Sequence, residues 1–478
     1  MPKIKKQKLK VLFIASECAP VVKVGGLGDV IGSLPKALKK IGVDVSVLIP
    51  KYRKIKGINP KLKKSFKIDF GDKKEKVTLY KAKIPNSEVS LYLLENKKYI
   101  SSGGVYFSSS AMAFTQKEIN RFAFFSKAAI PFISEFNPDI VHCHDWHVGI
   151  IPDLLKKENI RIPSIFTIHN LANQGFSQLG ILRKLSFIKT PSALINWDAQ
   201  DGNLDFILQG IVSSDILTTV SPSYAKEVMT PDFGEGLNEI LKAREARIFG
   251  ILNGIDYGVW NPQKDEKIFR KYSIKNYKKK KAENKKALQE KLGLPNDSKV
   301  PVLAMISRLT WQKGFDLMLD IFDKILEQKV QIVILGVGEK VLEKSLKTKE
   351  RKNKTKVSVN IKFDERLAHQ IYAGADIFII PSRFEPCGLC QMIAMRYGTV
   401  PVVRKTGGLA DTVEDKKTGF VFEEYKPSAL FEKIKQALNL YSNKRKWQDL
   451  IVAIMKKDFS WKKSAKEYLK IYKKLIDI

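Results

Sequence analysis

The chain has 478 residues, and a chain of that length suits two large domains better than one. Apolar residues make up 44% of it and aromatic residues 10%, which excludes an intrinsically disordered protein. No stretch of 18 or more apolar residues occurs, so no membrane span is expected. Four cysteines are too few for a disulfide framework, which favours a reducing, cytoplasmic environment.

The net charge of +34 allows two interpretations. One is a polyanionic partner, such as nucleic acid or anionic lipid. The other is a lysine-rich surface spread over the whole protein, which implies no partner. We favour the second, because most of the excess is lysine rather than the arginine that base readout favours. The lysines also occur singly or in short runs such as residues 278–281, so we expect no specific nucleic acid and no membrane as partners.

The first half of the chain begins with a basic stretch over residues 3–10. A signal peptide would need a longer apolar segment and a cleavage site, so we expect a basic tail followed by a buried strand over 11–16. Apolar side chains then recur at helical spacing over 27–41, and Gly42 follows as a helix stop. Further strands of this half are expected over 43–49, 139–143, 164–169 and 216–221.

The alternation of strand, loop and helix starts again in the second half. Two such series predict an α/β fold with two doubly wound, Rossmann-like domains. We place these domains at residues 1–255 and 256–461, and an amphipathic final helix at 462–478. A lysine-rich segment over 264–291 follows the seam. The strands expected in the second domain are 302–307, 331–335, 357–363, 376–381 and 400–403.

Ligands of open α/β sheets bind at the carboxyl ends of the strands, so the cleft between the two domains is the expected active site. The first motif there is residues 23–29, Lys-Val-Gly-Gly-Leu-Gly-Asp. Glycines and a helix N-terminus suit an anion, and Lys23 adds a mobile cation. The spacing fits neither the dinucleotide-binding fingerprint nor the Walker A loop. A tight turn alone would explain the glycines but not Lys23 and Asp29.

The second motif, residues 307–314, also follows a strand and opens a helix. Arg308 and Lys313 would both point at the cleft and form a diphosphate clamp. Charge-assisted hydrogen bonds of this kind contribute about 1.5–3 kcal/mol each. Taken singly, either residue could also be an ordinary surface cation of a basic protein.

The third motif is residues 381–390, again between a strand and a helix. Glu385 precedes Pro386, which favours an extended turn that aims the carboxylate outward, where it would meet sugar hydroxyls. The amides of Gly388, Leu389 and Cys390 then start a helix that could hold phosphate.

A fourth motif, residues 167–170, ends a strand with His169 and Asn170. The alternative to a site residue is a buried, hydrogen-bonded histidine. Residues 142–147 contain three histidines and an aspartate, but no zinc spacing fits them, so no metal is expected. The Cys387-x-x-Cys390 spacing matches a redox motif, but a thioredoxin-like domain would be shorter and would place the pair after its first strand.

Together these motifs resemble those of bacterial glycogen synthases and plant starch synthases, which are retaining glycosyltransferases with two facing Rossmann-like domains (GT-B). The resemblance covers nearly the whole chain. The Lys-x-Gly-Gly-Leu loop and the Glu-Pro-Cys-Gly-Leu turn are its most specific parts. It implies transfer of glucose from ADP-glucose to the non-reducing end of an α-1,4-glucan, with retention of configuration and release of ADP. No cofactor is implied.

The resemblance also implies residue roles. Lys23, His169, Arg308, Lys313 and Glu385 would be catalytic. Lys23 and the Gly25 and Gly26 amides would lie at the donor phosphates and the reacting sugar, and the final helix would pack back on the first domain. The other residues implied in substrate binding are Glu17, Asp29, Tyr106, Asp145, Asn170, Asn253, Cys387, Gly388, Leu389 and Cys390.

The sequence departs from the family pattern at three positions: Val24 replaces a small polar residue, Gly28 replaces Ala, and Cys390 stands where many members have Thr. Loss of a hydroxyl at residue 390 implies weaker donor binding. No clear second carboxylate serves as a nucleophile, so we favour attack by the acceptor hydroxyl on the face that the diphosphate leaves. The alternatives are a related glycosyltransferase with another acceptor, such as a sucrose-type or lipid enzyme, and a catalytically weak glucan- or nucleic-acid-binding protein.

Overall fold

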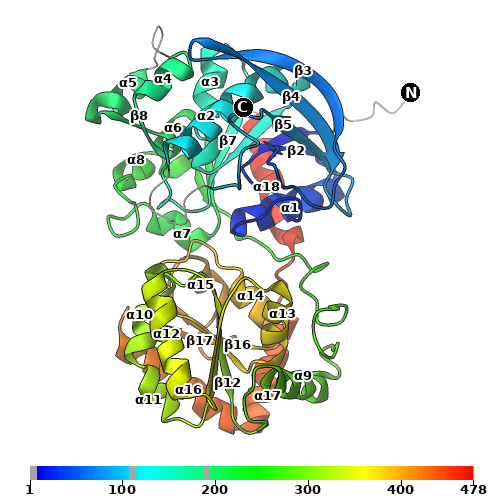
Figure 1. Cartoon of the computed structure of the whole chain (residues 1–478), viewed down its shortest axis with the longest axis vertical. Helices are drawn as coiled ribbons and strands as arrows, with labels where there is room; N and C mark the ends of the chain where they lie inside the picture. The colour runs from blue at the N-terminus through cyan, green and yellow to red at the C-terminus, as the bar shows by residue number, and fades with distance from the viewer. Residues whose placement is uncertain (1–7, 107–114, 188–192, 477–478) are drawn as a thin grey trace. The chain divides into compact units, whose positions relative to one another are not determined.

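The structure is a computed structural model that describes residues 8–106, 115–187 and 193–476 (Figure 1). Most of the basic tail predicted at the start, residues 1–7, lies outside these ranges. The chain divides into two compact units. The first comprises Met1–Gly254 and Trp461–Ile478, and the second comprises Ile255–Ser460.

The first unit is built on a nine-stranded sheet with the order β11-β10-β7-β6-β1-β2-β5-β4-β3. All neighbours are parallel except β5-β4 and β4-β3, which are antiparallel. The strands are β1 (Lys10–Ile14), β2 (Asp44–Pro50), β3 (Lys61–Phe70), β4 (Lys73–Lys83), β5 (Ser90–Glu95), β6 (Ile140–His144), β7 (Ser164–Ile168), β10 (Ile216–Thr219) and β11 (Ile248–Gly250). A separate two-stranded sheet pairs β8 (Phe176–Gln178) with β9 (Asn203–Asp205).

Helices pack on the parallel part of this sheet. Alternate residues of β1, Val11 and Phe13, share one core with the apolar side chains of α1 and α18. The prediction that the final helix returns to the first domain is therefore confirmed. The helices of this unit are α1 (Gly26–Lys40), α2 (Gln116–Phe136), α3 (Ile151–Lys157), α4 (Gly180–Lys184), α5 (Ala193–Asp198), α6 (Phe206–Ser213), α7 (Pro222–Glu227), α8 (Asn238–Ala243) and α18 (Trp461–Ile476).

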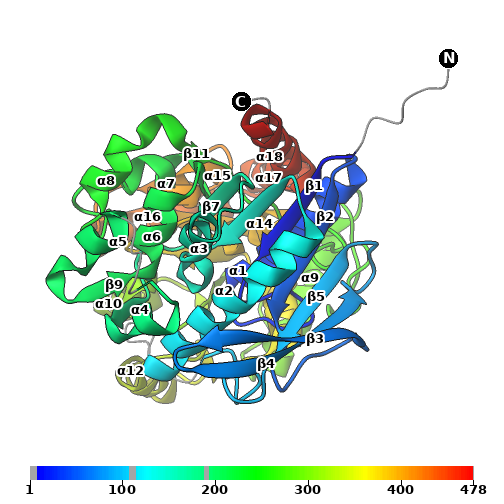
Figure 2. The same cartoon turned by 90° about the horizontal axis from the view of Figure 1, so that it is seen from above.

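The β3–β4 hairpin was not predicted from the sequence. It extends the sheet beyond β5, as Figure 2 shows. Its outer strand is largely exposed and rich in lysine, and only Ile68 and Phe70 of β3 are buried. The sequence therefore lacks the continuous apolar run by which strands buried on both faces are found.

The second unit has a six-stranded parallel sheet with the order β14-β13-β12-β15-β16-β17. Its strands are β12 (Val302–Ile306), β13 (Gln331–Gly336), β14 (Val357–Ile361), β15 (Ile377–Ile380), β16 (Val400–Arg404) and β17 (Phe420–Phe422). Its helices are α9 (Tyr277–Lys291), α10 (Phe315–Asp320), α11 (Phe322–Leu326), α12 (Lys340–Lys352), α13 (Glu365–Gly374), α14 (Cys390–Arg396), α15 (Gly407–Thr412), α16 (Pro427–Ser442) and α17 (Lys444–Lys456). The predicted fold class of two doubly wound α/β units is confirmed.

The lysine-rich segment before β12 corrects one expectation. The sequence predicts that runs such as 278–281 are surface lysines, but Lys281 and Lys285 on α9 are buried. The ammonium group of Lys281 donates to the carbonyl oxygens of three residues and to the hydroxyl of Thr399. Since helical periodicity turns every fourth residue to the same face, two lysines of this helix serve the core. In the described ranges no helix combines the length and apolarity needed to cross a membrane.

Candidate functional site

The loop between β1 and α1 carries Lys23 and the paired glycines. The Lys23 ammonium lies 2.7 Å from the carboxylate of Asp29, and both side chains are partly exposed. A side chain added at Gly25 or Gly26 would meet no heavy atom within 4 Å, so space is open beside the loop backbone. An anionic ligand can therefore approach this backbone closely.

Glu17 fixes the backbone of this loop through two hydrogen bonds. Its Oε2 accepts hydrogen bonds from the Val24 amide at 2.5 Å and the Gly25 amide at 3.0 Å. Only 2% of Glu17 is exposed, and burial raises the pKa of its carboxyl. The Gly25 amide, which the family resemblance places at the donor phosphates, is thus engaged by Glu17 in this structure.

Tyr106 joins the same cluster. Its hydroxyl donates to Glu17 Oε1 at 3.4 Å and lies 2.8 Å from Nε2 of His147. Burial raises the pKa of Tyr106 well above its usual value, so the phenol keeps its proton. The structure thus brings together Glu17 and Tyr106 beside the Lys23 loop.

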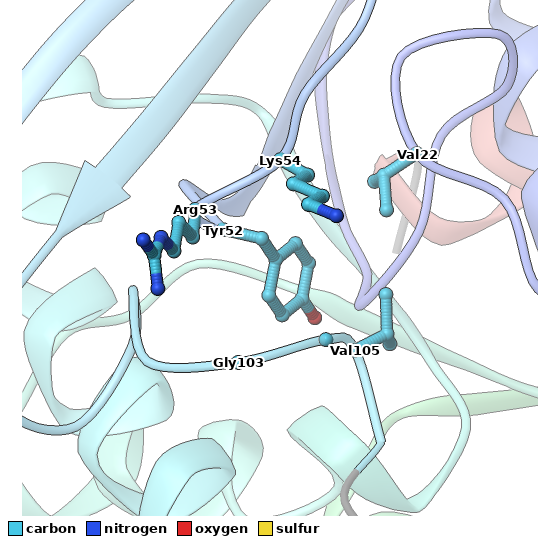
Figure 3. Close-up of a pocket in the computed structure, with 7 residues that line it drawn as sticks. Val22, Tyr52, Arg53, Lys54, Gly103 and Val105 are labelled. Atoms are coloured by element: carbon cyan, nitrogen blue, oxygen red, sulfur yellow. The ribbon is translucent and has the colours of Figure 1, made fainter.

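A pocket of about 460 Å³ adjoins this cluster (Figure 3). The Tyr52 hydroxyl donates to the carbonyl oxygen of Ser16 at 2.8 Å, next to Glu17. In Figure 3 the side chain of Lys54 extends toward Val22, which precedes Lys23. The sequence analysis named none of the residues that line this pocket. The pocket is lined by Val22, Tyr52, Arg53, Lys54, Gly103, Gly104 and Val105.

His169 follows β7 and is held by two residues that follow or end β6. Its amide donates to Asp145 Oδ1 at 2.7 Å, and its Nε2 lies 3.0 Å from Nδ1 of His144. Burial lowers the pKa of His169 to about 3, so the imidazole is neutral at physiological pH. Burial also raises the pKa of Asp145 to about 7. Asp145 adopts φ = 60°, which is uncommon for a residue other than glycine. Its hydrogen bonds to Thr167 of β7 and to the His169 amide hold this conformation.

The two candidate asparagines are placed differently. The Asn170 side chain accepts a hydrogen bond from the Ala172 amide at 3.2 Å and so shapes its own turn. Asn253 is 6% exposed, and its Oδ1 has no hydrogen-bond partner among the residues described.

The histidines of β6 and of the turn after it do not form a metal site in the described part of the chain, where no group of three or more histidine, cysteine or acidic side chains is arranged to hold an ion. His142 is bonded instead to Tyr472 and Thr167. All four cysteines are thiols and not disulfides, and Cys390 Sγ lies 3.7 Å from the carbonyl oxygen of Ile306.

In the second unit, the segments after β12 and β15 meet. The Lys313 ammonium lies 2.6 Å from Glu385 Oε2, and the Ser382 hydroxyl donates to the same oxygen at 2.9 Å. The expectation that Pro386 aims the Glu385 carboxylate outward is wrong: Glu385 is 9% exposed, because its carboxylate turns to Lys313 and Ser382.

Close backbone contacts fix this geometry. Gly314 has φ = 73°, and a Cβ there would lie 2.1 Å from the carbonyl oxygen of Pro381. The Arg383 amide donates to the carbonyl oxygen of Gln312 at 2.9 Å. Any larger residue at position 314 would push the two segments apart, and with them Lys313 and Glu385.

The remaining residues of these two motifs are more open. Arg308 is exposed and forms no ion pair with any residue in the described ranges. Cys387 is buried, whereas Gly388, Leu389 and Cys390 are half-buried at the start of α14.

Sequence reasoning missed Phe363. This residue follows β14 and is 84% exposed, and β14, β13 and β12 are parallel neighbours, so Phe363 and Arg308 lie at the same edge of the sheet. The sequence signal is an aromatic residue directly before Asp364, the N-cap of α13. The sequence prediction of a strand over 357–363 includes Phe363, whereas β14 ends at Ile361.

Comparisons with known proteins give the family. Residues 10–243 match the family described as "Starch synthase catalytic domain", and residues 284–475 match "Glycosyl transferases group 1". The glycogen synthase of Clostridium botulinum (strain Alaska E43 / Type E3) is 42% identical over 486 residues, which cover 98% of this chain and 99% of that protein. The glycogen synthase of Kosmotoga olearia is 43% identical, with 98% of each chain covered. This chain belongs to the glycogen synthase family.

One solved structure agrees with that membership, and a second shares the fold. The catalytic domain of Starch Synthase IV from Arabidopsis thaliana, bound to ADP and acarbose, superimposes with a TM-score of 0.88 at 34% identity, and the match covers 99% of this chain and all of the solved chain. A sucrose-phosphate synthase from Thermosynechococcus elongatus, at a TM-score of 0.62 and 16% identity, shares the fold. The predicted GT-B glycosyltransferase fold and the predicted family are confirmed.

Proposed function

We propose that the chain transfers glucose from ADP-glucose to the non-reducing end of an α-1,4-glucan with retention of configuration and releases ADP. The observation that carries the proposal is the Lys313–Glu385–Ser382 cluster in a glycogen synthase family member, together with the exposed Arg308, which like Lys313 follows β12. The choice of ADP rests on the similarity to the starch synthase solved with ADP and acarbose. The proposed location is cytoplasmic, which suits four cysteines that remain thiols.

In the second unit, Arg308 and Lys313 bind the diphosphate, and Glu385 accepts a hydrogen bond from a glucose hydroxyl. Cleavage of the sugar–phosphate bond builds negative charge on the phosphate, which cations placed beforehand stabilise without reorganisation. The ion pair with Glu385 keeps Lys313 in place before the donor arrives. The amides of residues 388–390 and the Cys387 turn lie beside this cluster in sequence and complete the proposed donor contacts.

In the first unit, Lys23 supplies a further cation, and the Gly25–Gly26 backbone leaves room for the donor. His169 is a neutral imidazole and acts as a hydrogen-bonding partner of the sugar. Glu17 and Asp145 position other residues of the site: Glu17 accepts a hydrogen bond from the Lys23 loop, and Asp145 accepts one from the amide of His169. Asp29, Tyr106, Asn170 and Asn253 are the remaining proposed contacts of this unit.

The acceptor hydroxyl attacks the anomeric carbon on the face from which the diphosphate leaves, and the departing phosphate takes its proton. Arg308 and Lys313 stabilise the leaving diphosphate throughout this step. No protein carboxylate forms a covalent bond to the sugar, so trapping of a glycosyl-enzyme adduct would contradict this mechanism.

The test measures nucleotide release by the purified protein with glycogen and either ADP-glucose or UDP-glucose. Glycogen-dependent release of ADP is expected. Lys313→Ala and Glu385→Ala should each lower turnover by about 10²–10³-fold, the usual effect of removing one group that stabilises a transition state. Lys340→Ala and Glu424→Ala are matched controls, since Lys340 is 89% and Glu424 66% exposed. Release that prefers UDP-glucose would overturn the donor, and no release with either donor would favour another acceptor or a binding protein.

A further inference from the structure

Strand β6 presents two histidines on one face of the first unit's sheet. His142 and His144 are two residues apart, so their side chains leave the strand on the same side. Their rings stack with centroids 4.2 Å apart, and the Phe13 ring of the neighbouring strand packs against both. Neither histidine is exposed, and burial lowers the pKa of each well below its usual value. Both imidazoles are therefore neutral.

His144 is the direct partner of His169. Nδ1 of His144 lies 3.0 Å from Nε2 of His169. Since His169 is also neutral, one of these two nitrogens carries a hydrogen and the other accepts it. If His144 donates, its Nε2 is bare and Nδ1 of His169 carries a hydrogen. If His169 donates, Nε2 of His144 carries a hydrogen and Nδ1 of His169 is bare.

The surroundings of Nε2 of His144 show which of the two tautomer pairs is present. Nε2 of His144 is buried and has no hydrogen-bond partner among the described residues. If it carried the hydrogen, a buried N–H would be left unsatisfied, which folded proteins rarely tolerate. If it is a bare acceptor, the cost is smaller. The hydrogen of His144 therefore sits on Nδ1 and is donated to Nε2 of His169.

We propose that His144 is a positioning residue that fixes His169 in the tautomer with its hydrogen on Nδ1, so that His169 offers substrate a hydrogen-bond donor. This proposal rests on the role of His169 in the proposed function. Its consequence is that His169 donates to an oxygen of the sugar and does not take a proton from the acceptor hydroxyl.

The C-terminal helix α18 contacts His142, the other ring of the stacked His142–His144 pair. The Tyr472 hydroxyl on α18 lies 2.9 Å from Nδ1 of His142, and Nε2 of His142 lies 2.6 Å from the Thr167 hydroxyl. Burial raises the pKa of Tyr472 well above its usual value, so the phenol keeps its hydrogen and donates it. His142 is thus fixed at both nitrogens, and its ring supports the face of His144.

Nitrogen-15 NMR of the histidine rings tests the tautomer directly. The chain contains five histidines, so single His→Gln substitutions can assign the spectrum. The shifts and couplings of His169 are expected to show a hydrogen on Nδ1 and a bare Nε2 at neutral pH. A hydrogen on Nε2, or a mixture of both tautomers, would overturn the proposal.

Kinetics test the coupling between the two residues. His144→Phe keeps a ring but removes the donor, and it should lower kcat about tenfold. His144→Asn places an amide N–H at the position of Nδ1 and should restore most of that loss. In the His169→Ala background, His144→Phe should have no further effect on kcat, because the two substitutions remove one interaction. Losses that multiply in the double variant would mean that His144 acts only through the packing, contrary to the proposal.

Tyr472→Phe is the matched control, because it removes a hydroxyl from the same network without touching His144. It should lower Tm and leave kcat and the His169 tautomer unchanged. Failure of the proposed function is a separate outcome: full activity of His169→Ala would remove its catalytic role, whereas the NMR result on the tautomer would stand on its own.

Discussion

Phe363 is an apolar ring that the fold leaves 84% exposed at the edge of the sheet that also carries Arg308. Ligands of open α/β sheets bind at the carboxyl ends of the strands, and Phe363 follows the carboxyl end of β14. We propose that this ring stacks on the nucleobase of the donor. Stacking of a base on an aromatic ring contributes about 1–3 kcal/mol.

Phe363→Ala should therefore raise the KM for the nucleotide sugar by about tenfold or more and change kcat little. Steady-state kinetics with saturating glycogen provide the measurement. Phe363→Tyr keeps the ring and serves as the control, with a KM near that of the unmodified protein. An unchanged KM in the alanine variant would place the base elsewhere.

Asp205 combines a structural role with a shifted pKa. It is the N-cap of α6, with Oδ1 accepting the amides of Ile207 and Leu208 at 2.8 and 3.2 Å. Burial raises the pKa of its carboxyl from 3.8 to about 7. The folded state therefore holds this proton more tightly than the unfolded state. The stability that results is present in full below pH 4 and is lost as the pH rises to about 7.

Asp205→Asn should remove this dependence and keep the cap, because Asn is also a good N-cap. Between pH 4 and pH 7 the unmodified protein should lose on the order of 1–3 kcal/mol more stability than the variant. Chemical denaturation of both proteins at several pH values measures the difference. Parallel pH profiles would show that the carboxyl titrates normally in the folded protein.

At the scale of elements, α9 shows how a charged sequence can build a core. Lys285 lies 2.9 Å from Asp376 Oδ2 and 3.0 Å from the Tyr441 hydroxyl, and only 6% of its side chain is exposed. Asp376 also accepts the amide of Val302, the first residue of β12. The buried pair thus ties a helix to the start of a central strand.

Lys285→Met should destabilise the second unit by about 3 kcal/mol, because it leaves the Asp376 carboxylate, of which only 13% is exposed, without its cation. Lys286→Met is the matched control on the same helix: its side chain is 69% exposed, and its effect should stay within about 0.5 kcal/mol. Urea denaturation followed by circular dichroism measures both. Equal effects of the two substitutions would mean that the buried pair contributes no more than a surface lysine.

Helix α9 also shows which features could not be predicted from the sequence. Strands such as β1 and β12 are continuous apolar runs buried on both faces, so they were predicted to within two residues. Lysines in a charged run give no sign of which face they occupy, so the burial of Lys281 was missed. The exposed, alternating pattern of β3 was missed for a related reason.

The candidate site was predicted by a rule of topology, namely that residues following parallel strands gather at one edge. That rule identified Arg308, Lys313 and Glu385, and the structure brings the last two into contact. It could not give the direction of the Glu385 carboxylate, because that depends on a partner 72 residues away in sequence. It also could not show that Phe363 leaves the core, since a phenylalanine next to a strand is usually buried.

At the scale of the whole molecule, the chain passes between the two units twice, after Gly254 and after Ser460. The two crossings lie side by side, because the amide of Ile255 donates to the carbonyl oxygen of Phe459 at 2.8 Å. The last 18 residues thus belong to the first unit although the second unit precedes them. The stability of the first unit therefore depends on the end of the chain.

Tyr468 provides the test of this dependence. It is fully buried on α18 in the core that includes β1 and α1. Tyr468→Ala should destabilise the first unit by about 3 kcal/mol, the usual effect of removing a buried aromatic ring. Hydrogen exchange read by mass spectrometry should then show faster exchange in β1 and β2 and unchanged exchange in β12 and β13.

Lys470→Ala is the control for this substitution, because Lys470 lies on the exposed side of the same helix with 72% of its side chain accessible. It should leave exchange in all four strands unchanged. If Tyr468→Ala accelerated exchange equally in β1 and β12, the two units would unfold as one cooperative body. If it accelerated neither, the C-terminal helix would contribute little to the core that it covers. Faster exchange confined to β1 and β2 would establish that the end of the chain completes the domain with which the chain begins.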